Sequence, residues 1–382
     1  MTPKALSSST ILRAVSDESM GFRFGKPERP NESSLACILP ILRETSLERQ
    51  YVTLPETENV LVSDSGTINR INLKNASKKN VFVRSGTIFE GKGTQSRALT
   101  RSAVLFPGTE VALDVRCVHQ THGIRTGAEF KYGGITPLEV DSSLYAAGYR
   151  PQDQHTMWNA VRHTTASMRT MSGSPEGAVA AQSAPSVPKQ APGIIARVAS
   201  RPEPEMFVAD VVSPPDVVPM APPPVSPARH DAGVFGSGAD NLKQEFDAFA
   251  RNFDAMLSKA RLHDNQVGLA LITETGCKTI ELFDLSASWE AIHKDAVKRM
   301  GTELLRGPDN TQVFEYKPEN AVNAVRQVLG LDYKTNLIYE HKPGNGEPPV
   351  AIFGITAARY VGEIVEIDGR VVHLTILETA VV

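Results

Sequence analysis

Residues 81–118, VFVRSGTIFEGKGTQSRALTRSAVLFPGTEVALDVRCV, decide how the first half of the chain folds. Near the end of this stretch Val111, Leu113, Val115 and Cys117 alternate with polar or small residues. A period of two predicts a strand with one buried face. The apolar runs on either side of FEGKGTQSR predict two further strands joined by that polar loop. Other short apolar runs before residue 81 end at turn-forming residues, so we predict a β-rich lobe.

A proline-rich segment divides the chain. Half of the 26 prolines lie between residues 172 and 236. Proline removes a backbone donor and favours extended conformers, so we predict no packed core there. The sequence leaves open whether the lobes on either side form one composite domain. We predict four segments: a weakly ordered N-terminal segment at 1–33, a β-rich lobe at 34–171, a disordered Pro-rich linker at 172–236 and an α+β lobe at 237–382.

Helix and strand patterns mix after the linker, whereas the first lobe has one helix at its end. The expected fold class is therefore α+β, with a β-rich N-terminal lobe, a mixed C-terminal lobe and a disordered Pro-rich insertion. The expected helices are Gln154 to Met168, one capped by Asp240, one starting near Ser286, and Pro318 to Leu329. The expected strands are a hairpin around Glu274-Thr275-Gly276 and three closing strands, at 337–339, 351–367 and 371–377, with Asp368-Gly369 as the last turn.

Composition excludes several classes of protein. The 40 basic and 43 acidic residues nearly balance, which argues against a surface that binds nucleic acid. Three widely spaced cysteines make no disulfide framework, so we expect a reducing, cytoplasmic location. The N-terminal residues lack the apolar core of a signal peptide, and no apolar run is long enough to span a bilayer, so we expect no membrane partner.

The loop FEGKGTQSR concentrates residues that bind phosphate and sugar. Glycine lets the backbone approach a ligand closely, and a lysine and an arginine suit a phosphate as a point charge and as a two-pronged donor. Two alternatives stay open: a bulged hairpin with solvated charges, or polar side chains that satisfy backbone groups inside the bulge. On the ligand hypothesis, Lys92 and Arg97 hold phosphate, Glu90 and Gln95 orient a sugar, and Gly91 and Gly93 shape the turn.

A second cluster follows at the end of the strand that contains Cys117. Alternation places Cys117 and His119 on one face, where a thiol and an imidazole could act as nucleophile and base. Cys117, His119 and His122 could also offer metal ligands, but no fourth ligand is nearby, so we expect no metal. We favour the interpretation that His119, Gln120 and His122 line the same mouth as the glycine loop.

These motifs resemble a little-studied family of prokaryotic domains that is named for its association with ADP-ribosylglycohydrolases and with rhodanese and phosphatase-superfamily proteins. The family has a Gly-rich turn, Gln-x-Arg, an apolar strand and a strand ending Cys-Val-x-Gln. The resemblance continues in VGLALITETGCKTIELFD and GRVVHLTILE, after the linker. The chain departs from the pattern in a longer glycine turn, in His119 at an acidic position, and in Thr121-His122-Gly123 in place of a Gly-Arg-Trp-like ending.

The resemblance implies a link to ADP-ribose or another NAD-derived nucleotide, and the residue types of the loop suit such a ligand independently. We therefore expect intracellular binding or processing of that class of small molecule, without a cofactor. If a reaction occurs, Glu90 or His119 is the expected base. The alternative is a non-enzymatic scaffold that recruits a protein partner through short apolar islands in the linker, at residues 193–198 and 206–212.

Overall fold

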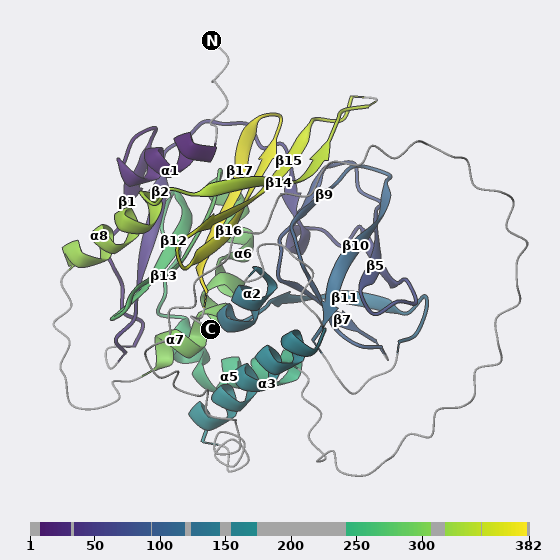
Figure 1. Ribbon diagram of the computed structural model, residues 1–382, viewed down its shortest axis with the longest axis horizontal. Helices are drawn as coiled ribbons and strands as arrows, with labels where there is room; N and C mark the ends of the chain where they lie inside the picture. The colour runs from purple at the N-terminus through teal and green to yellow at the C-terminus, as the bar shows by residue number, and fades with distance from the viewer. Residues whose placement is uncertain are drawn as a thin grey trace, which may run out of the picture. The chain divides into compact units, whose positions relative to one another are not determined.

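An eight-stranded antiparallel sheet forms one half of the structure (Figure 1). The computed structural model describes residues 8–31, 34–92, 94–118, 124–145, 154–173, 242–306, 318–344 and 346–379. The strands of the sheet, in spatial order, are β1 (Phe22–Phe24), β2 (Cys37–Arg43), β12 (Gln266–Thr273), β13 (Gly276–Phe283), β17 (Arg370–Glu378), β16 (Tyr360–Ile367), β15 (Val350–Ala357) and β14 (Lys334–His341).

A closed six-stranded barrel forms the other half, and its interior is the apolar cluster around Ile71, Leu73, Phe89, Leu99 and Val115. A three-stranded sheet, in which β3 and β6 run parallel, lies in the same part of the chain. The barrel order is β10 (Glu110–Cys117), β5 (Arg70–Asn75), β4 (Val60–Asp64), β11 (Glu129–Ile135), β7 (Thr87–Gly91) and β8 (Arg97–Leu99); the small sheet is β3 (Val52–Thr53), β6 (Val81–Val83) and β9 (Ala103–Leu105).

Helices cover both faces of the large sheet. One face packs against α1 (Ser8–Ser16) and α8 (Pro318–Leu329), because α8 places Ala321, Val325 and Val328 at helical spacing in that core. The other face packs against α6 (Ser286–Arg299), which also contacts β11 of the barrel. The remaining helical elements are η1 (Leu54–Glu56), α2 (Leu138–Tyr145), α3 (Gln154–Met171), α5 (Leu242–Leu257) and α7 (Gly301–Leu305).

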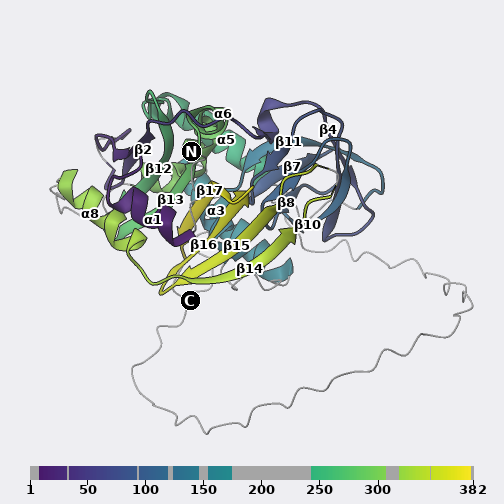
Figure 2. The ribbon, with the colours of Figure 1, turned by 90° about the horizontal axis from the view of Figure 1, so that it is seen from above.

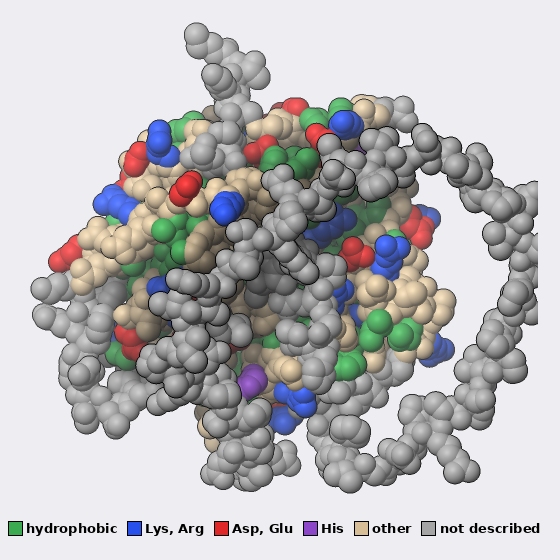
Figure 3. All heavy atoms as spheres, viewed as in Figure 1, with side chains coloured by type: hydrophobic (Ala, Val, Ile, Leu, Met, Phe, Trp, Pro, Cys, Tyr) green, Lys and Arg blue, Asp and Glu red, His purple; other side chains and the backbone are tan. Residues whose placement is uncertain are grey.

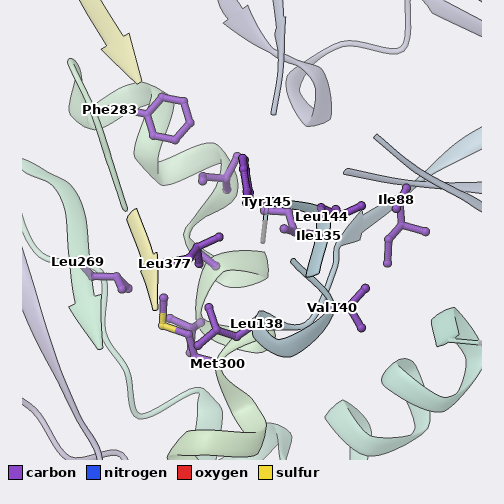
Figure 4. Packing of buried hydrophobic residues seen from close by; sticks show 14 of the residues in the cluster. Ile88, Ile135, Leu138, Val140, Leu144, Tyr145, Leu269, Phe283, Met300 and Leu377 are labelled. Carbon is purple, nitrogen blue, oxygen red and sulfur yellow. The ribbon is translucent and has the colours of Figure 1, made fainter. Parts of the chain in front are cut away.

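The barrel and the sheet share one hydrophobic core. Ile88 and Ile135 come from barrel strands β7 and β11, and Leu269 and Leu377 come from the sheet, yet all four belong to the same buried cluster (Figure 4). Tyr145 of α2 lies in this cluster and is fully buried. Because the two halves bury apolar surface against each other, the parts that we predicted as two lobes pack as one body.

The α+β fold class is confirmed, and four details differ from the expectation. The first lobe has a second helix, α2, before the one that we expected. Part of the N-terminal segment 1–33 forms α1 and β1. Strand β2, which we assigned to the first lobe, pairs with β12 of the second. The single strand expected at 351–367 is the hairpin of β15 and β16, which turns at Ala358 and Arg359. Most of the predicted linker falls within 174–241, outside the described residues.

A buried ion network joins the barrel to the sheet. Arg84, in the turn between β6 and β7, donates to both carboxylate oxygens of Glu281 on β13, with Nη2 3.1 Å from Oε2. The same Nη2 lies 3.0 Å from Asp141 Oδ2 on α2. Arg299 of α6 completes the network, with Nη1 2.7 Å from Glu281 Oε2 and Nη2 3.2 Å from Asp141 Oδ2. All four side chains are at most 3% exposed, so two cations and two anions compensate each other out of water.

Gly86 lets the turn approach this network. Its φ is +72°, and a Cβ at this position would lie 2.5 Å from Asp141 Oδ1 and 2.7 Å from Thr136 Oγ1. Gly108 has the same φ, but a Cβ there would meet no atom within 4 Å. Substituting alanine at Gly108 therefore adds backbone strain alone, whereas alanine at Gly86 adds the same strain and also displaces the network. Comparing the two substitutions separates these two losses of folding stability.

We predict that Gly86→Ala destabilises the protein far more than Gly108→Ala. Gly108→Ala, the control, should lower the free energy of unfolding by about 1 kcal/mol, from left-handed backbone strain alone. Gly86→Ala should lower it by about 3 kcal/mol or more, because its methyl group also displaces Asp141. Urea unfolding of both variants measures the difference. Equal losses would show that the network tolerates a methyl group at residue 86.

Candidate functional site

The predicted ligand loop is the turn that joins β7 to β8 at one end of the barrel. Glu90 and Lys92 are both exposed, and Glu90 pairs in register with Lys131 of β11. A Cβ at Gly91 would lie 2.5 Å from Thr94 Cγ2 and 2.7 Å from Thr94 O, so this glycine permits the turn to fold tightly. Gly93 is one of the residues that the structure leaves undescribed.

Arg97 and Gln95 point into the protein. Arg97 has no exposed surface, and its Nη1 donates to Gln95 O at 2.8 Å and to Gln95 Oε1 at 3.2 Å. Its Nη2 lies 3.7 Å from Asp64 Oδ2, and Cys117 is its cross-strand neighbour. Burial lowers the pKa of the Arg97 guanidinium, against the opposing effects of Cys117 and Asp64. We expected Arg97 to hold a phosphate; instead it organises the turn from inside, as in the backbone-satisfying alternative.

Thr94 connects this turn to a second one. Its hydroxyl donates to Asp64 Oδ2 at 2.8 Å and accepts a hydrogen bond from Arg125 N at 3.2 Å. Lys92 N donates to Glu129 O, which ties the turn to the start of β11. The side chain of Arg125 is exposed. The structure thus brings a cation that the sequence analysis missed to the same end of the barrel as Lys92.

The second predicted cluster is only partly described. Cys117 is buried, and Val118 N donates to Ser96 O at 3.0 Å, so this strand end lies beside the turn. His119, Gln120 and His122 fall within 119–123, for which the structure gives no description. Within the described part of the chain, no three His, Cys, Asp or Glu side chains gather as a metal site would require. All three cysteines are described, and none forms a disulfide.

The match to a protein family extends far beyond this turn. Residues 26–377 match the ARG and Rhodanese-Phosphatase-superfamily-associated Protein domain. The chain belongs to this family. The membership confirms the resemblance found in the turn and in the strands after the linker, and it covers both halves of the fold. No curated protein and no solved structure matches the chain.

The surface of this family member carries charges of both signs. On the face in Figure 3, Lys and Arg side chains are interspersed with Asp and Glu side chains. None of the helices in the described ranges combines the length and apolar character that a membrane crossing requires. The chain as a whole has no excess of positive charge. Lys92 and Arg125 are therefore notable because two cations lie at the same end of the barrel.

Further buried ionisable residues, which the sequence analysis did not single out, lie near the network. Glu363 of β16 is fully buried and accepts hydrogen bonds from Ser102 N at 3.2 Å. Burial raises its pKa to about 7, and burial likewise raises the pKa of Asp141 to about 7 despite Arg84. The pKa of the His373 imidazole, 3.3 Å from Glu281, is lowered by burial. These groups are all enclosed within the protein.

A small hollow reaches the edge of the network. Arg84, Tyr132 and Phe283 are among its lining residues, and it has room for about 10 Å³, close to that of one water molecule. The Tyr132 hydroxyl donates to Asp295 Oδ2 at 2.7 Å. This hollow is too small to hold a nucleotide.

We predict that Glu363→Gln changes how stability depends on pH. The unfolded chain releases this proton near pH 4.5, but the folded protein holds it to about pH 7. Glu363 therefore contributes fully to the free energy of unfolding below about pH 4.5, and this contribution is lost as pH rises to about 7. Over that range the free energy of unfolding of wild type should fall by about 3 kcal/mol relative to that of the variant.

Urea unfolding at pH 4.5, 6 and 7.5 provides the measurement. Glu110→Gln, at an exposed barrel position, is the matched control and should follow the wild-type profile. A wild-type-minus-Glu363→Gln difference that stays constant with pH would contradict the prediction.

Proposed function

We propose that this chain binds an ADP-ribose-like or other NAD-derived nucleotide at the barrel end formed by residues 91–96 and 124–128. The main support for the proposal is a pair of hydrogen bonds made by the Thr94 hydroxyl, one to Asp64 and one from the backbone N–H of Arg125. These bonds join the turn that contains Lys92 to the turn that contains Arg125. Lys92 and Arg125, both exposed, extend from those turns. Two cations on turns that are joined by hydrogen bonds suit the two negative charges of a pyrophosphate.

The interior of the turn supports this arrangement. Asp64 is 2% exposed, and its carboxylate is occupied by Thr94 Oγ1 and the nearby Arg97. The acid is therefore turned away from a bound anion, whereas the cations face solvent. Arg97 holds Gln95 O and Oε1, so its part in binding is to position the turn, not to contact phosphate.

The remaining predicted residues belong to the same proposal. Glu90 is exposed next to Lys92 and is the proposed partner of a ribose hydroxyl, or the base if the ligand is processed. His119, Gln120 and His122 follow Val118, whose backbone is bonded to the turn, and we propose them as further ligand contacts. Recruitment of a partner through residues 172–236 stays an alternative without a described contact in its favour.

Calorimetric titration with ADP-ribose tests the proposal. Wild type should bind, and Lys92→Ala and Arg125→Ala should each weaken binding about tenfold or more, since each removes a charge-assisted hydrogen bond. Lys74→Ala, at an exposed position on β5 of the same barrel, should leave the dissociation constant unchanged. Arg97→Ala is a poor probe, because loss of a buried guanidinium should lower the melting temperature.

Two further ligands locate the contact. Pyrophosphate should compete with ADP-ribose, and ribose should compete far more weakly, because the cations recognise the phosphates. Absence of ADP-ribose binding in wild type, or equal weakening by Lys74→Ala and Lys92→Ala, would overturn the proposal.

A further inference from the structure

Strand β14 is a long, open edge of the large sheet. It is the last strand in the spatial order, paired with β15 on one side, and the described residues place no strand on its other side. Figure 2 shows β14 at the margin of the sheet. The opposite edge, β1, has 3 residues, whereas β14 has 8. Short edges resist pairing with other chains, and a long one offers a row of unpaired backbone groups.

Strand β14 exposes large apolar side chains as well as charged ones. Leu337 is 55% exposed and Tyr339 is 36% exposed, and the strand contains no proline. A bulge at Ile338 interrupts the register with β15, and this bulge and the exposed charges of Lys334 and Glu340 are protective features of the strand. Exposed apolar side chains on an edge favour addition of another strand.

Contacts with the barrel hold β14 in an extended form. The Arg101 guanidinium lies 4.9 Å from the centre of the Tyr339 ring, and the Phe106 and His341 rings are 4.6 Å apart. Arg101 and Phe106 belong to the barrel half, so the strand is fixed at its C-terminal part before any partner arrives. A pre-ordered strand loses little entropy on pairing.

We propose that β14 pairs antiparallel with β14 of a second copy of this chain across a two-fold axis. The strand reads KTNLIYEH, with a cation at its start and an acid near its end. An antiparallel pair centred on Leu337 places Lys334 of one copy directly opposite Glu340 of the other, and the symmetry repeats this contact. Side chains directly opposite each other are within contact distance.

The charges favour a second copy over an unrelated extended peptide. Among the described residues Glu340 forms an ion pair with Lys342 at 3.7 Å, and both side chains are largely exposed, so this pair is weak and Glu340 is available. The strand is thus complementary to itself in one orientation only. Parallel pairing would place Lys334 beside Lys334 and Glu340 beside Glu340, which repel. Leu337, which is exposed in the single chain, then buries apolar surface against Leu337 of the second copy at the centre of the antiparallel pair.

Charge reversal tests the pairing directly. Analytical ultracentrifugation from about 5 to 500 µM, a range suited to a small interface, should show a monomer–dimer equilibrium for wild type. Lys334→Glu and Glu340→Lys should each weaken dimerisation about tenfold, because each places like charges opposite one another. The double variant Lys334→Glu/Glu340→Lys restores opposite charges and should recover dimerisation close to that of wild type.

A pair of apolar variants provides a matched control. Leu337→Lys should weaken dimerisation, whereas Leu61→Lys, at a barrel position that is 61% exposed, should not. Circular dichroism checks that each variant is folded. The proposal is overturned if wild type stays monomeric over the whole range, if the single charge reversals leave the dimer unchanged, or if the double variant is as weak as the singles.

Discussion

The paired guanidinium groups of Arg84 and Arg299 around Glu281 and Asp141 are the constraint on which the rest of the structure depends. These four charges come from a barrel turn, α6, β13 and α2, and all four side chains are at most 3% exposed. Shifting the barrel relative to the sheet while both stay packed would leave Arg84 or Glu281 buried without its partner. The cost of an unpaired buried charge exceeds that of most apolar contacts, so the network makes the relative position of the two halves specific.

The network also positions the candidate site. Strand β7 begins one residue after Gly86, which touches Asp141 and Thr136, and ends at Gly91, where the proposed ligand turn starts. Five residues of extended chain span about 16 Å, so the site and the network are the two ends of one short strand. At the end of β7 that leads into the proposed ligand turn, Arg97 has a similar role. Its buried guanidinium donates a hydrogen bond to Gln95 and so holds the turn. The turn that carries the exposed Lys92 is therefore held in place from inside the protein.

Local sequence signals predicted many of the elements. The Asp368-Gly369 turn has positive φ at both residues, as such a hairpin requires. Strand β10 buries Leu113, Val115 and Cys117, as the alternation indicated. The hairpin between β15 and β16 was missed because Ala358, with φ of 48°, is not a typical turn residue. The pairing of β2 with β12 joins residues more than 200 positions apart, which no local pattern can specify.

The candidate site was harder to predict, because residue type does not fix exposure. Arg97 looked like a surface cation and is buried, whereas Arg125 carried no motif and lies at the site. A stronger signal was present in the apolar strands, where Glu281, Glu363 and His373 each interrupt a hydrophobic run. Charged residues in such runs need buried partners, and those partners form the junction of the fold.

A double-mutant cycle on Arg84 and Glu281 tests this account most directly. Arg84→Met and Glu281→Met should each lower the free energy of unfolding by about 3–5 kcal/mol, because each leaves buried charge uncompensated. The double variant should lose less than the sum by at least about 1 kcal/mol, with a single unfolding transition for barrel and sheet. Additive losses, or separate transitions in wild type, would contradict the claim that this network unites the two halves.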